Sequence, residues 1–144
     1  MSTDSSKLAS LKTYMLIAFI FNILAIIAFV IYGIWDIYAG ATISSYLGGY
    51  LGYAAGWGTT TIIMGVVFLV IGGIAAWIFL TRVNPMYKAA NTGDVATLKS
   101  LNNMMWAILT LIFTGVLPGI MLLISFGPIN ELGQAQTPPP PPPM

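Results

Sequence analysis

The longest uncharged stretch of the sequence runs from Ile37 to Thr81 and reads IYAGATISSYLGGYLGYAAGWGTTTIIMGVVFLVIGGIAAWIFLT. As a single helix it would measure about 68 Å, at 1.5 Å per residue. The hydrocarbon core of a bilayer is only about 30 Å thick, so one crossing cannot use the whole stretch. We therefore divide it into a transmembrane helix over residues 59–80 and a preceding Gly/Tyr-rich segment over residues 36–58. That segment reads as an interfacial or re-entrant helix, or as an ordinary loop.

Two further uncharged stretches, Thr13–Trp35 and Ser100–Asn130, lie on either side of the first. Each supplies the roughly 20 apolar residues that a transmembrane helix needs, and we expect spans at 13–35 and 104–126. The chain is 58% hydrophobic and 6% charged, whereas a soluble domain carries about 25% charged residues. The sequence thus predicts an all-α integral membrane protein with three transmembrane helices and a Gly/Tyr-rich interfacial or re-entrant segment.

The distribution of basic residues predicts the topology. Basic residues resist translocation and stay in cytoplasmic segments, while acidic residues have little effect. Three crossings place all five basic residues on one side, namely Lys7, Lys12, Arg82, Lys88 and Lys99. We expect a cytoplasmic leader (1–12), a membrane domain (13–130) with an extracellular segment (36–58) and a cytoplasmic loop (81–103), and a Pro-rich tail (131–144). The N-terminus is then cytoplasmic and the C-terminus outside.

The expected cytoplasmic loop carries two helix signals. Asn84-Pro85 suits a helix start, with Asn as the N-cap and Pro at the first helical position. Asn91-Thr92-Gly93 reads as a break, and Asp94 offers a second N-cap. In the first span, Asn22 is the one strongly polar residue, and we expect it to make a packing contact with another helix. The tail ends in Pro138–Pro143, which favours an extended polyproline spacer.

Composition excludes several chemistries. The chain has no Cys and no His, which removes thiol nucleophiles, disulfides and the usual zinc sites. Its four acidic residues are scattered, and no ionisable residue lies deep in a predicted span, which disfavours proton relays. A net charge of +1 gives no electrostatic reason to expect nucleic acid as a partner. We expect no enzymatic activity, no cofactor and no metal.

Small residues mark three candidate helix-packing faces, because they let two backbones approach closely in a membrane. The faces are Gly48/Gly52/Gly56, Gly65/Gly72/Ala76 and Gly115/Gly119. They can contact a partner chain, or the chain's own helices can use them.

A polar stripe on the third expected span is the second candidate site. Asn103, Thr110, Thr114 and Ser125 share one face of a continuous helix, and Pro118 predicts a kink beside them. Such a stripe can line a wet path. Hydroxyls of this kind more often bond back to their own helix.

These features favour a non-catalytic structural or accessory membrane protein that packs through its small-residue faces into a larger assembly. That assembly would be a membrane complex or the hydrophobic coat or envelope of a virus. The expected partners are the lipid bilayer, copies of the chain and other membrane subunits. The alternative is an oligomeric channel or small transporter, lined by the polar face of the third span.

Overall fold

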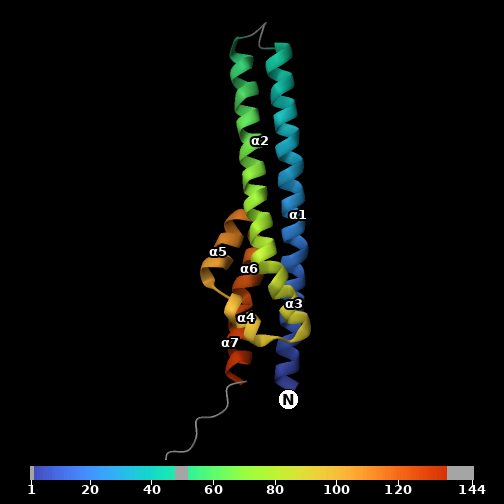
Figure 1. Cartoon of the computed structure of the whole chain (residues 1–144), viewed down its shortest axis with the longest axis vertical. Coiled ribbons are helices and arrows are strands. Elements are labelled where there is room, and N and C mark those ends of the chain that lie inside the picture. Colours follow the sequence, from blue (N-terminus) through green and yellow to red (C-terminus); the bar gives the residue numbers. More distant parts are fainter. Residues whose placement is uncertain (1, 48–51, 136–144) are drawn as a thin grey trace, which may run out of the picture. The chain divides into compact units, whose positions relative to one another are not determined.

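The computed structural model describes residues 2–47 and 52–135, and side chains within 4–46 and 56–135. These residues form helices joined by short turns (Figure 1). The elements are α1 (Ser2–Leu47), α2 (Gly52–Ile78), a π-helical turn η1 (Phe79–Val83), α3 (Asn84–Thr92), α4 (Val95–Leu101), α5 (Met104–Phe113), α6 (Val116–Ile124) and α7 (Phe126–Ala135). The chain forms two compact units: a hairpin unit, Ile23–Trp77, and a terminal unit made of residues 1–22 and 78–144.

Three helical segments are long and apolar enough to cross a membrane: Asp4–Tyr46, Gly56–Thr92 and Val116–Ala135. The prediction of an all-helical chain with three helices long and apolar enough to span a membrane is confirmed for the described residues. The second segment passes from α2 through η1 into α3 without a break. Asn84 is therefore inside a continuous helix and is no N-cap, and its backbone N–H donates to the Phe79 carbonyl.

The hairpin unit is held together by glycines that recur every seven residues. Within it, α1 and α2 run side by side in opposite directions (Figure 1). Seven residues are close to two helical turns, so the repeat keeps these glycines on one face. The buried glycines are Gly33 and Gly40 on α1, and Gly58, Gly65 and Gly72 on α2. A Cβ on Gly40 would lie 2.5 Å from the Gly58 carbonyl oxygen, and one on Gly65 would lie 2.6 Å from the Gly33 carbonyl oxygen. The backbones are thus too close for any side chain at these positions.

The outer surface of the hairpin unit carries large apolar side chains. Trp35 and Tyr38 are 65% and 67% exposed, and Ile31 and Ile34 beside them are similarly exposed. Asp36 is the one charged residue in the sequence of this unit. A surface of this kind is typical of one that contacts a membrane or another protein.

The segment expected between the first two spans is not a separate element. Residues 37–47 complete α1, and α2 begins at Gly52. Tyr46 and Trp57, which a single helix over 36–58 would place on one stripe, belong to different helices, and both are exposed. Of the first small-residue set, Gly48 and the surroundings of Gly52 lie outside the described residues.

The terminal unit has a core built from α1, α3, α4 and α7. Leu11, Met15, Leu98 and Ile129 are fully buried in it. Phe19 of α1 contacts two rings from the middle of the chain: Tyr87 of α3 at 4.6 Å and Phe79 of η1 at 5.1 Å, between ring centroids.

The turn between α3 and α4 agrees with the sequence prediction. Gly93 closes α3 with a left-handed φ of 73°, a conformation that glycine adopts without strain. Asp94 is the N-cap of α4, and its carboxylate accepts hydrogen bonds from the backbone N–H and the hydroxyl of Thr97. The break at Gly93 and the cap at Asp94 are both confirmed.

Residues 104–126 do not form the single continuous helix that was expected. The helix stops at Thr114, and Gly115, at φ 111°, turns the chain into α6. Pro118 lies in the first turn of α6, where a missing N–H breaks no helical bond. The predicted kink at Pro118 is therefore replaced by a turn three residues earlier.

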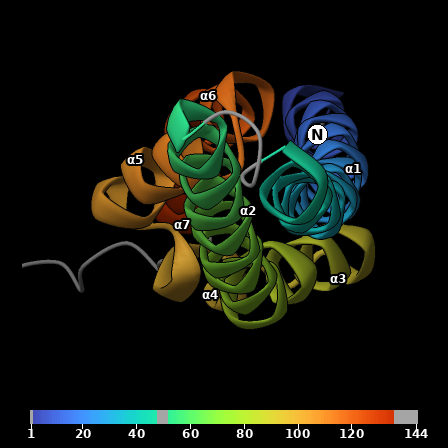
Figure 2. The ribbon, with the colours of Figure 1, turned by 90° about the horizontal axis from the view of Figure 1, so that it is seen from above.

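Helices α5 and α6 form a tight hairpin and lie beside each other (Figure 2). A Cβ on Gly119 would overlap the backbone and Cβ of Leu111. Gly119 thus lets α6 lie against α5, while its predicted partner Gly115 serves the turn and has open space around it.

We expect Gly65→Ala to destabilise the hairpin unit by about 1–3 kcal/mol, the usual cost of overpacking. Gly73→Ala in the same helix is the matched control, because nothing lies within 4 Å of a Cβ there. Since alanine favours a helix over glycine by about 1 kcal/mol, the control should be neutral or stabilising. Thermal unfolding in detergent measures both variants. Equal melting temperatures would refute the close packing.

We expect the α4 cap to make stability depend on acid pH. The hydrogen bonds from Thr97 lower the pKa of Asp94 from 3.8. Its contribution is therefore fully present above that value and is lost as the pH falls through the lower folded pKa. Asp94→Asn keeps a capping oxygen but does not titrate, so its melting temperature should fall less between pH 5 and pH 2. A parallel fall in both proteins would argue against the cap.

Candidate functional sites

An ion pair joins the first and last helices of the terminal unit, α1 and α7. The Lys7 ammonium of α1 contacts the Glu131 carboxylate of α7, and the hydrogen bond raises the pKa of Lys7. The two side chains are 34% and 57% exposed, so the pair adds little stability. The cytoplasmic N-terminus and outside C-terminus stay predictions.

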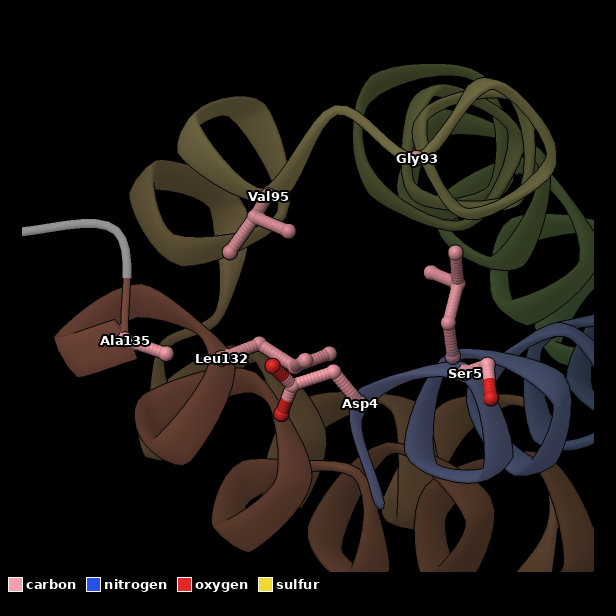
Figure 3. A pocket seen from close by; sticks show the side chains of 7 residues that line it. Asp4, Ser5, Gly93, Val95, Leu132 and Ala135 are labelled. Carbon is pink, nitrogen blue, oxygen red and sulfur yellow. The ribbon is translucent and has the colours of Figure 1, made fainter. Parts of the chain in front are cut away.

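The terminal unit also contains a cavity of about 240 Å³, whose lining includes the residues that follow Lys7 and Glu131 in the sequence (Figure 3). Its lining comes from α1, the α3–α4 turn and α7: Asp4, Ser5, Leu8, Gly93, Val95, Leu132 and Ala135. Figure 3 shows Asp4, Val95 and Leu132 around the opening. Asp4 is the one ionisable residue of this lining, so the cavity offers no pair of acid and base groups.

The predicted polar stripe does not form a continuous path through the described residues. Thr110, Thr114 and Ser125 are buried. Their hydroxyls donate to the carbonyls four residues earlier, those of Trp106, Thr110 and Met121, at 2.6–2.7 Å. Asn103 caps α5 by accepting from the Met105 backbone N–H at 2.9 Å. The break at Gly115 also ends the single helical face on which the stripe depended.

The small-residue faces are mostly occupied by the chain itself. Gly65 lies against Gly33 and Ile37, and Gly119 lies against Leu111. A Cβ added to Gly72 would lie 3.1 Å from the Phe29 Cβ. Ala76 is half-buried. Gly56 has nothing within 4 Å of a Cβ, so the described part of the first set makes no close contact.

Sequence reasoning missed Gly33, Gly40 and Gly58, which make the closest approaches in the hairpin unit. The available signal was the spacing of seven residues in Gly33/Gly40 and in Gly58/Gly65/Gly72. A search for glycines four apart does not find this repeat. Asn22 is fully buried, as a packing contact requires, but neither its Oδ1 nor its Nδ2 makes a hydrogen bond to the described residues.

Within the described residues, no group of three or more His, Cys, Asp or Glu side chains lies close enough to hold a metal ion. Comparisons with protein families, with curated proteins and with solved structures find no match to this chain.

We expect the variant with Lys7→Cys and Glu131→Cys to be joined within one chain by a flexible, reducible bis-thiol crosslinker. The chain has no cysteine of its own, and the tips of the two native side chains are in contact. A crosslinker is used because a direct disulfide needs Cα atoms within about 7 Å, closer than two long side chains require. A mobility shift that reducing agent reverses would report the link, and the two single variants are the controls for links between chains. A double variant that is not crosslinked, with its two thiols labelled from opposite sides of proteoliposomes, would refute the contact.

Proposed function

We propose that the protein is a non-catalytic structural or accessory membrane protein, and that the hairpin unit crosses the bilayer. One observation carries this proposal: the hairpin unit buries its glycines between its helices and turns its large apolar side chains outward. Each arm, Ile23–Leu47 and Gly52–Trp77, is about 37 Å long at 1.5 Å per residue. That length suits a hydrocarbon core of about 30 Å.

The exposed aromatic residues of the hairpin unit support a lipid-facing role. Trp and Tyr are enriched where a bilayer meets water, because their rings are apolar and their N–H or O–H groups are polar. Trp35 and Tyr38 flank Asp36 within the α1 arm, whereas Tyr46 and Trp57 lie near the ends of the two arms that precede and follow residues 48–51. We infer that Tyr46 and Trp57 lie at the outer head-group level. Asp36 lies about 16 Å further along α1, inside the proposed span, where a carboxylate is costly and needs a polar or charged partner.

We infer that the α5–α6 hairpin enters the bilayer without crossing it. The ten residues of α5 rise about 15 Å, half of the hydrocarbon core. Ile112 and Val116, on either side of the Gly115 turn, are 63% and 61% exposed. With two crossings by the hairpin unit, Glu131 and all five basic residues then lie on the cytoplasmic side. This arrangement keeps the positive-inside distribution and accommodates the Lys7–Glu131 ion pair.

The contacts within the chain change the expected mode of assembly. Because Gly65, Gly72 and Gly119 already pack against the chain's own helices, a partner in a complex or a coat would contact large side chains. Ile31, Ile34, Trp35 and Tyr38 form an open, apolar surface on α1. A channel is less favoured, because the buried hydroxyls that would line it are bonded to their own helices.

We expect the purified protein in liposomes to show no ion-selective flux. Selective pores use rings of charges or ordered carbonyls, and Thr114 already donates its hydroxyl to Thr110. Thr114→Val should cost about 0.5–1.5 kcal/mol of stability and leave the background flux unchanged. Flux assays and thermal unfolding test the two effects. A reproducible selective current that Thr114→Val abolishes would overturn the structural role.

The number of copies in a native particle tests the assembly itself. We expect native mass measurements in lipid nanodiscs to find the chain with copies of itself or with larger subunits. A Trp35→Ala change should weaken that association, because it removes a large exposed ring. Val70→Ala, on an exposed site of α2, is the control. A chain that stays monomeric and partnerless at all concentrations would contradict an assembly role.

A further inference from the structure

A second, smaller cavity of the terminal unit combines a cation with unpartnered donors. Its volume is about 10 Å³. It lies where η1 and α3 approach α5, α6 and the end of α4, and its lining is Arg82, Met86, Leu101, Asn102, Asn103, Trp106, Ala107 and Leu122. Arg82 Nε and Asn102 Nδ2 are both buried, and neither has a hydrogen-bond partner among the described residues. Both atoms are donors, so the group that would satisfy them is an acceptor.

The charge of this cavity favours an anion. None of its lining residues is acidic, so the Arg82 guanidinium is not neutralised from within the site. The guanidinium carbon lies 4.5 Å from the centre of the Trp106 ring, a cation–π contact that holds the planar group in place. Helix α5 begins at Met104, directly after Asn102 and Asn103, and the N-terminus of a helix carries partial positive charge.

The size of the cavity limits what enters it. A volume of about 10 Å³ holds roughly one water-sized atom, so a single oxygen fits and a whole phosphate does not. The remainder of a larger anion would stay at the mouth. The side-chain Oδ1 of Asn103 is not the missing acceptor, because it accepts from the Met105 backbone N–H and neither buried donor is bonded to it.

The position of Arg82 in the sequence indicates where the anion comes from. Arg82 is the first charged residue after the uncharged stretch 37–81. A charged residue at the end of a transmembrane helix lies at the level of the lipid head groups. The phosphate of a head group is the abundant anion at that level, and arginine recognises phosphate through paired N–H donors.

We propose that Arg82 and Asn102 bind one oxygen of a phosphate group, beside the ring of Trp106. The source of the phosphate is the head group of an anionic lipid or free inorganic phosphate. The lipid source rests on the proposed insertion of the hairpin unit in a bilayer. The site itself rests on the cavity, the two buried donors and the cation–π contact.

The test measures binding to the full-length protein in detergent. Trp35, Trp57 and Trp77 are replaced by Phe, so that Trp106 fluorescence alone reports on the site. The protein is titrated with short-chain phosphatidylglycerol, with the matched diacylglycerol that lacks phosphate, and with inorganic phosphate. We expect phosphatidylglycerol to bind at least ten-fold more tightly than the diacylglycerol.

Three variants of the site and one control variant distinguish binding at the site from the effect of general surface charge. Arg82→Gln and Asn102→Leu should each weaken phosphatidylglycerol binding about ten-fold or more, because each removes a donor to an ionic oxygen. Arg82→Lys keeps the charge but loses the planar fork, and should fall between them and the wild type. Lys88→Gln is the control: it removes one charge from the exposed surface of the same unit and should change binding less than two-fold.

If inorganic phosphate binds as tightly as phosphatidylglycerol and displaces it, the site is supported and its ligand is free phosphate. Equal binding of phosphatidylglycerol and the diacylglycerol would overturn the proposal, as would equal losses in Arg82→Gln and Lys88→Gln. Helical content and melting temperature of each variant show that the fold persists. Co-flotation with liposomes tests membrane insertion separately: variants that still float but no longer discriminate phosphate lose the site alone, whereas wild-type protein that fails to float contradicts the proposed function.

Discussion

The close approach of α1 and α2 is the constraint on which the hairpin unit depends. Lipid chains are as apolar as leucine, so burying leucine between two helices in a membrane yields little. Association instead depends on van der Waals contact between well-fitted surfaces. Glycines at intervals of seven bring the two backbones together along Gly33, Gly40, Gly58 and Gly65, and at that distance Cα–H groups and carbonyls can also interact. The large apolar side chains of the hairpin unit then lie on its outer surface.

The terminal unit follows a different physical logic, because it contains eight of the nine charged residues of the sequence and a buried apolar core. Its elements are short, and it uses devices common in soluble proteins: a left-handed glycine at Gly93, a carboxylate cap at Asp94 and an ion pair between Lys7 and Glu131. The two units are therefore stabilised differently: the hairpin unit by close packing of backbones at glycines, and the terminal unit by an apolar core with capped turns and an ion pair.

The sequence predicted helix type and number better than helix ends. Uncharged length alone identified the apolar helices, because charge in the hydrocarbon core is expensive. It could not locate the break in the third stretch, since Pro118 is the obvious helix breaker and Gly115 is the actual one. The difference is one of context: proline is harmless in a first turn, and only a residue that tolerates a φ of 111° can make the turn before it. The polar stripe failed for the same reason.

The distribution of basic residues fits both the predicted three crossings and the two crossings proposed above. Five basic residues on one side constrain only the segments that carry them, and they say nothing about Glu131 and the residues after it. A helical hairpin that enters a membrane halfway and a helix that crosses it have similar composition, and they differ in whether the chain turns back. Local packing decides whether it turns back. Between α5 and α6, the absence of a side chain at Gly119 lets α6 lie against Leu111. A contact between distant residues, such as Lys7 with Glu131, carries the information that a linear charge count lacks.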